Sequence, residues 1–118
     1  PQVPEYRSLY AGTLARIAGI QVLQGKSEQA ESTLQEVLTH NQQLAEQFPD
    51  VLMYQLAVAR TQQQLAHIYG KNKRTDMAKK SLDDAIKRLE GLPVRSRGRN
   101  PVSLILTRMR ESRSKLGD

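Results

Sequence analysis

Residues 16–38, RIAGIQVLQGKSEQAESTLQEVL, recur in altered form 48 residues later as residues 64–86, QLAHIYGKNKRTDMAKKSLDDAI. The first segment places a small residue, Ala18, after a large apolar one, and a second alanine, Ala30, twelve residues further on. The later segment has alanines at the same two positions. Two copies of one pattern at a fixed spacing indicate an internal repeat, and the small residues allow two helices to approach closely.

Both copies have the periodicity of paired helices. Large residues recur at steps of three and four, as on one face of a helix, and no run alternates as a strand does. Gly25 interrupts the first stripe, and we expect it to adopt a left-handed turn conformation. Ser27, and Thr75 in the second copy, are expected to cap the helices that follow. The stripe positions are Tyr6, Leu9, Tyr10, Thr13, Leu14, Ile17, Ile20 and Leu23 in the first helix, and Val51, Tyr54, Val58, Thr61, Leu65, Ile68 and Tyr69 in the third.

The composition is that of a small folded domain with an aliphatic core. The 118 residues are 38% hydrophobic and 25% charged, with one Phe and no Trp. The absence of cysteine excludes disulfides and thiolate chemistry. No apolar run approaches the roughly 20 residues that a membrane span requires. Because the chain begins at Pro1 rather than Met, we expect a fragment of a longer protein.

Charge is unevenly divided along the chain. The formal net charge is +6. Residues 1–70 contain four basic and six acidic residues, a net charge of −2, whereas residues 71–118 contain fourteen basic and six acidic residues, a net charge of +8. An anionic partner is therefore expected at the C-terminal end.

The spacing of large and small residues in each copy resembles the tetratricopeptide repeat, a helix–turn–helix unit of about 34 residues. This resemblance implies an all-α fold: an α–α superhelix of two long repeats, about 1–48 and 49–92, followed by a C-terminal capping helix. The chain departs from the repeat pattern at Gln62, where a large apolar residue is usual, and at Lys73, where the turn glycine is usual.

Residues 93–118 are predicted to form a separate basic loop and the capping helix. Asn100-Pro101 is a favourable helix start. The apolar stripe that follows would cover the open end of the last repeat. Two alternatives stay open: a basic helix that docks on nucleic acid or anionic lipid, and the start of a third, degenerate repeat. The stripe consists of Val102, Ile105, Leu106, Met109 and Leu116.

A narrower resemblance covers about residues 1–92. Residues 3–51, VPEYRSLYAGTLARIAGIQVLQGKSEQAESTLQEVLTHNQQLAEQFPDV, are similar to the lengthened repeats that follow the kinase domain in planctomycete-type bacterial serine/threonine protein kinases. This resemblance implies a regulatory or partner-recruiting segment of a larger bacterial signalling protein. The chain contains no kinase residues, so any kinase activity would belong outside it.

The sequence contains no recognised catalytic or cofactor-binding constellation. His40 and His67 are the only histidines, and no further ligands stand at metal-binding spacing. Asp83 and Asp84 are adjacent, so on a helix their side chains splay by about 100°. The Gly-Lys-Ser of residues 25–27 lacks the preceding strand and the spacing of a phosphate-binding loop. We therefore expect no enzyme, no metal and no cofactor.

Small residues on the first helix and polar residues on the third stand at equivalent positions. In the repeat family these positions line the concave groove, so the resemblance implies a small-residue floor beside a polar stripe that holds a partner helix or an acidic peptide. Gly12 and Gly19 could instead allow tight packing against a neighbouring repeat. The predicted groove consists of Gly12, Ala15, Gly19, Arg60, Gln63, His67 and Lys71.

The leading hypothesis is a non-catalytic scaffold for a protein or peptide partner, with self-association through open repeat ends as a further possibility. The alternative is binding of nucleic acid or an anionic surface through the basic C-terminal region. Nucleic acid is the less expected partner, because no aromatic residue lies between the arginines to stack on bases. The compartment is left open, with the cytoplasm favoured. The predicted basic patch consists of Lys73, Arg74, Arg95, Arg97, Arg99 and Arg108.

Overall fold

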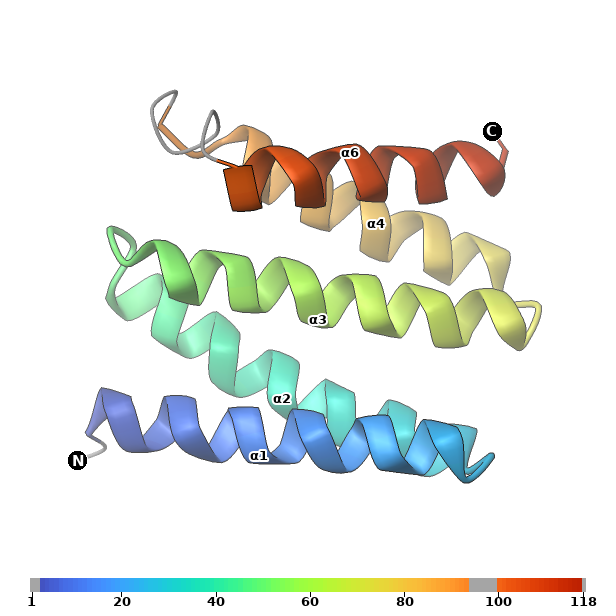
Figure 1. Ribbon diagram of the computed structural model, residues 1–118, viewed down its shortest axis with the longest axis horizontal. Coiled ribbons are helices and arrows are strands. Elements are labelled where there is room, and N and C mark those ends of the chain that lie inside the picture. Colours follow the sequence, from blue (N-terminus) through green and yellow to red (C-terminus); the bar gives the residue numbers. More distant parts are fainter. Residues whose placement is uncertain (1–2, 94–99, 118) are drawn as a thin grey trace. The chain divides into compact units, whose positions relative to one another are not determined.

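The computed structural model describes residues 3–93 and 100–117, with only the backbone described at 100 and 101. Every regular element in these ranges is an α helix (Figure 1). The expected fold class, an all-α fold of two long helical repeats followed by a capping helix, is confirmed. The helices are α1 (Pro4–Leu23), α2 (Ser27–Gln47), α3 (Leu52–Lys71), α4 (Thr75–Glu90) and α6 (Asn100–Lys115).

Two compact units make up the chain, Pro1–Thr61 and Gln62–Asp118, so α3 begins in one unit and ends in the other. In the first unit α1 packs along α2, and the two helices run in opposite directions (Figure 1). In the second unit α4 and α6 pack in the same antiparallel manner. The predicted division into repeats at 1–92 and a tail at 93–118 stays a prediction.

The turns between paired helices repeat at the spacing of 48. Gly25 has a φ of 76° and Lys73 a φ of 64°, so both adopt the left-handed conformation. The amide of Lys26 donates to the carbonyl of Gln21 at 2.8 Å. The equivalent pair, Arg74 and Tyr69, has the same 2.8 Å distance. The repeat therefore imposes this turn even where lysine replaces glycine, at a steric cost of about 1–2 kcal/mol.

The predicted caps at Ser27 and Thr75 are wrong. The N-cap residues are Lys26 and Arg74, and neither makes a side-chain capping hydrogen bond. The reason lies in the turn, because hydrogen bonds back to the preceding helix draw Lys26 and Arg74 into the cap position. Ser27 and Thr75 are consequently the first residues within their helices.

The small residues of the repeat pattern are buried in both units. Ala18 on α1 and Ala30 on α2 are buried, as are Ala66 and Ala78 in the second unit. The side chain of alanine is a single methyl group, so an alanine between two helices permits their backbones to approach closely. The burial of all four alanines agrees with the expected close contact, which itself stays a prediction.

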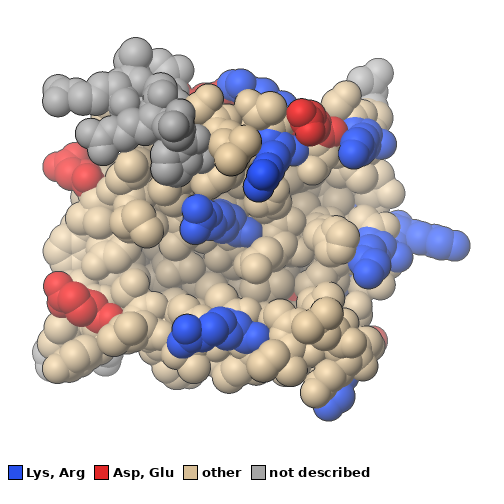
Figure 2. Space-filling model, in the orientation of Figure 1, with Lys and Arg blue, Asp and Glu red and all other residues tan. Residues whose placement is uncertain are grey.

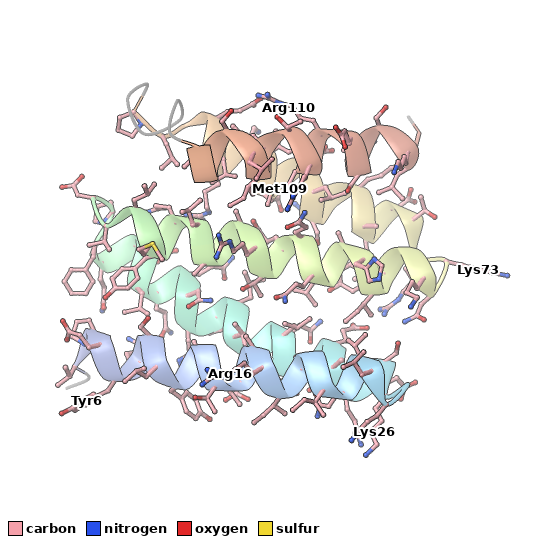
Figure 3. The ribbon with its side chains drawn as sticks, viewed as in Figure 1. Tyr6, Arg16, Lys26, Lys73, Met109 and Arg110 are labelled. Carbon is pink, nitrogen blue, oxygen red and sulfur yellow. The ribbon has the colours of Figure 1, made fainter. Side chains whose placement is uncertain are left out.

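The helix α6 covers α4 with the apolar stripe that the sequence predicted. Val102, Leu106 and Met109 are buried. Charged residues outside this stripe reach acidic residues of α4: Arg113 Nε donates to Asp83 Oδ1 at 2.7 Å, and Arg110 Nη2 donates to Glu90 Oε2 at 2.8 Å. Figure 3 shows Met109 and Arg110 on different sides of α6.

Candidate functional site

The small-residue part of the predicted groove lies on the accessible side of α1. Gly12 and Gly19 are exposed and Ala15 is half-buried. A Cβ atom added at either glycine would meet no atom within 4 Å in the described structure. No close approach within the first unit therefore requires these two glycines, which leaves their faces free for an outside partner.

Replacing Gly12 and Gly19 with alanine is expected to stabilise α1 by about 0.5–1 kcal/mol at each position, because alanine restricts the unfolded chain and favours a helix. Chemical denaturation followed by circular dichroism measures the gain. If α1 uses the bare glycine surface for a partner, the same double variant binds that partner more weakly. A loss of stability instead of a gain would show that the added methyl groups clash.

The polar part of the predicted groove lies along one face of α3, since its residues follow one another at steps of three and four. Arg60, His67 and Lys71 are exposed, and Gln63 is half-buried. Two permanent positive charges and a histidine therefore face solvent along three turns of the helix. A surface of this kind suits an acidic or amide-rich partner. The assembly of both parts into one groove stays a prediction.

The predicted basic patch is only partly available to a partner. Lys73 is exposed and projects beyond the turn (Figure 3), and Arg108 is exposed on α6. Arg74 is half-buried, with its guanidinium carbon 4.8 Å from the centre of the Tyr69 ring. Residues 95, 97 and 99, the other predicted arginines, lie outside the described residues.

Several other cations of the second unit are held by carboxylates. Lys80 Nζ lies 3.2 Å from Asp84 Oδ2, and Arg110 and Arg113 pair with α4 as described above. On the face shown in Figure 2, some lysine and arginine side chains adjoin acidic side chains, and others have uncharged side chains around them. Lys80, Arg110 and Arg113 thus have carboxylate partners, which lowers the field that they would create as unpaired charges.

A polar cluster joins α1 and α2 at a place that sequence reasoning assigned to an apolar stripe. The hydroxyl of Tyr10 donates to Glu36 Oε2 at 3.1 Å, and the Tyr10 ring meets His40 edge to face at 5.3 Å. The hydrogen bond from Tyr10 to Glu36, and then the negative charge of Glu36, raise the pKa of Tyr10 above its usual value. A depression of about 470 Å³ lies beside it, lined by Tyr6, Arg7, Tyr10 and His40.

Buried hydrogen bonds between α2 and the first half of α3 were also missed. Asn41 Nδ2 donates to Thr61 Oγ1 at 3.4 Å, and Gln55 Nε2 donates to the carbonyl of Ala45 at 3.2 Å. All three polar side chains are buried. The signal available in the sequence was a polar residue, Asn41, within an otherwise apolar stripe.

Among residues 3–93 and 100–117, no three histidine, aspartate or glutamate side chains gather as a metal site would require. Nor is any helix in those ranges long and apolar enough to span a bilayer. The adjacent Asp83 and Asp84 turn to different partners, Arg113 and Lys80, as their splayed positions predict.

Comparison with known families gives a match for one segment of the chain. Residues 59–88, from the middle of α3 to near the end of α4, match the family model for the tetratricopeptide repeat. This match and the helical structure support a tetratricopeptide repeat protein. The equivalent residues of the first copy, 48 positions earlier, are 11–40. Comparisons of the chain with curated proteins and with solved structures give no match. Tetratricopeptide repeats suggest a module that binds other proteins.

Proposed function

We propose that this chain is a non-catalytic protein-interaction module and that α3 supplies the main contact surface. The observation that carries the proposal is the exposed row of Arg60, His67 and Lys71 on a helix that belongs to a tetratricopeptide repeat match. An exposed row of this kind contributes nothing to the core, because core residues of α3 lie on its other faces. Such a row is therefore available to recognise a partner.

The chemistry of the row favours an acidic peptide or helix. Arg60 and Lys71 carry permanent charges and Gln63 can both donate and accept hydrogen bonds. The exposed glycines of α1 would add a surface that an approaching backbone can contact closely. Charge complementarity at the rim of such a surface mainly raises the association rate and the specificity.

The module is further proposed to be a regulatory or partner-recruiting segment of a larger bacterial signalling protein, such as a serine/threonine kinase. The support for this context is the resemblance of residues 3–51 to the lengthened repeats of such kinases. Within that context the chain positions a partner, and the chemistry belongs to another part of the protein.

The test is affinity capture from a lysate of the source organism at low and at high salt, followed by titration of the captured partner with purified chains. The variant Arg60→Ala/His67→Ala/Lys71→Ala is expected to lose roughly tenfold or more in affinity, because each removed polar or charged contact contributes about 1 kcal/mol. Lys73→Ala/Arg108→Ala removes the same number of permanent charges elsewhere and should keep the partner.

The opposite pattern would contradict the proposal. In that pattern the chain captures only nucleic acid or acidic material. The capture is lost at high salt and in the Lys73→Ala/Arg108→Ala variant, but it persists in the triple variant. This result would assign binding to the basic C-terminal region. Phosphate contacts produce that steep salt dependence, because binding releases condensed counterions.

A further inference from the structure

Three helices of the chain start at one spacing. The first residues of α1, α3 and α6 are Pro4, Leu52 and Asn100, and each start lies 48 positions after the previous one. Residues that share a place in this register therefore lie on the same face of their helices. In α3 and α6 this face packs against the helix that precedes it in the chain, since α3 is bonded to α2 and α6 packs on α4.

The same face of α1 has no such cover in the described structure. Tyr6 and Tyr10 are 69% and 51% exposed, whereas Val58, at the Tyr10 position of α3, is fully buried. The equivalent residues of α6, Val102 and Leu106, are also buried. Figure 3 shows Tyr6 projecting away from α1. The exposed stripe, which we call the outer face of α1, consists of Tyr6, Leu9, Tyr10, Thr13, Ile17 and Ile20 and contains no charged residue.

The hydroxyl of Thr13 is a polar group on this face that can accept a hydrogen bond from a covering helix. Thr13 donates to the carbonyl of Leu9 at 3.0 Å, as Thr61 donates to the carbonyl of Ala57 at 2.8 Å. The hydroxyl oxygen of Thr61 also accepts a hydrogen bond from Asn41 of the preceding helix. Thr13 therefore has the geometry that, one repeat later, receives an amide donor.

The equivalent positions on α4 and α6 also match one another in polarity. The residues 48 positions after Asn41 and Thr61 are Leu89 and Met109, and both are fully buried. The chain thus uses a polar pair at one helix seam and an apolar pair at the next. A threonine at position 13 accordingly favours a polar donor over leucine on the helix that would cover it.

The charge of Arg7 indicates the direction in which a covering helix would run. Gln55 reaches the carbonyl of Ala45 in the last turn of α2, and the equivalent residue of α1 is Arg7. The last carbonyls of a helix carry partial negative charge, and a guanidinium there is favourable. A helix that covers α1 with its C-terminal end near Arg7 would satisfy this charge.

We propose that the outer face of α1 docks an antiparallel amphipathic helix of the α2 type, with an asparagine-like donor opposite Thr13 and its C-terminal end near Arg7. This goes beyond the proposed function, because the surface is a different face of α1 from the glycine floor and does not involve α3. A second copy of the chain is the poorer occupant, since the face of its α2 that carries Asn41 is already bonded to α3 and its α4 packs on α6.

The test extends the full chain by inserting a second copy of residues 3–50 ahead of Val3, which keeps the spacing of 48. The added copy of α2 should then cover α1 as α2 covers α3. We expect amide hydrogen exchange in α1 to slow roughly tenfold or more relative to the unextended chain, and the melting temperature to rise by several degrees. A matched insertion, with Val37, Asn41 and Leu44 of the added copy replaced by serine, should give neither change.

A pair exchange tests the chemistry opposite Thr13. In the extended chain, Asn41→Leu in the added copy alone, or Thr13→Met alone, should lower the melting temperature. The two together should restore it, because they recreate the Leu89 and Met109 combination. The proposal would be overturned if amide hydrogen exchange in α1 were as fast in the extended chain as in the unextended one. It would also be overturned if the double variant lowered the melting temperature by the sum of the two single effects. So would sedimentation of the unextended chain as a dimer that Tyr10→Lys dissociates, which would assign the face to a second copy.

Discussion

Ala18→Leu is expected to lower the free energy of unfolding by about 1–3 kcal/mol. Ala18 of α1 and Ala30 of α2 are both buried, and α1 packs on α2. Leucine at this place adds three carbon atoms to a contact that has room only for a methyl group. The helices must then separate or their side chains must leave preferred rotamers, and either change destabilises the fold. Urea denaturation followed by circular dichroism measures the loss.

The neighbouring position Ala15 supplies the control. Ala15 is on the same helix but half-buried, so Ala15→Leu should change the stability by much less. The equivalent substitution in the second copy, Ala66→Leu, should resemble Ala18→Leu, because Ala66 is buried at the same register. Unchanged melting temperatures for both Ala18→Leu and Ala66→Leu would show that the repeat alignment is wrong.

Gln62→Leu is expected to raise the free energy of unfolding by about 1–3 kcal/mol, which is the cost of leaving a polar group buried without a partner. The Gln62 side chain is only 7% exposed, and its Oε1 atom has no hydrogen-bond partner among the described residues. Leucine has a similar size and carries no polar atom. The first copy already has leucine at the equivalent position, Leu14.

The adjacent residue Gln63 shows whether the gain comes from the burial of Gln62 or from any exchange of glutamine for leucine. Gln63 is half-buried, so Gln63→Leu should change the stability by only a few tenths of a kcal/mol. Gln62→Glu should be strongly destabilising, because it buries a charge at the same place. A loss of stability in Gln62→Leu would mean that Oε1 does have a partner, such as an internal water molecule.

The local features of the fold were predictable from short stretches of sequence. The alanines at the repeated spacing, Ala18 and Ala30, are buried, and Gly25 adopts the expected left-handed turn. These features depend on steric rules that act over a few residues. The caps at Ser27 and Thr75 were predicted wrongly for a related reason. Cap preferences describe an isolated helix start, whereas here hydrogen bonds from the preceding helix decide which residue takes the cap position.

The candidate site was less predictable than the fold. The exposure of Arg60, His67 and Lys71 follows from helical spacing once the core face of α3 is known. The contact of Tyr10 with Glu36 and His40 does not, because Tyr10 lies on α1 and the other two residues lie on α2, and no spacing rule relates positions on different helices. Likewise, the ion pairs between α6 and α4 hold arginines that composition alone would count as part of a free basic surface.

By itself, the sequence determined that this protein is helical, that it repeats every 48 residues, and where its tight turns and small contact residues lie. Periodicity, propensity and steric size are properties of neighbouring residues, so the chain carries that information locally. Only the tertiary structure decided which apolar stripes are buried. Tyr10 and Val58 occupy the same place in two similar stripes, yet one is exposed and the other buried, because burial depends on whether another helix is present to cover the face.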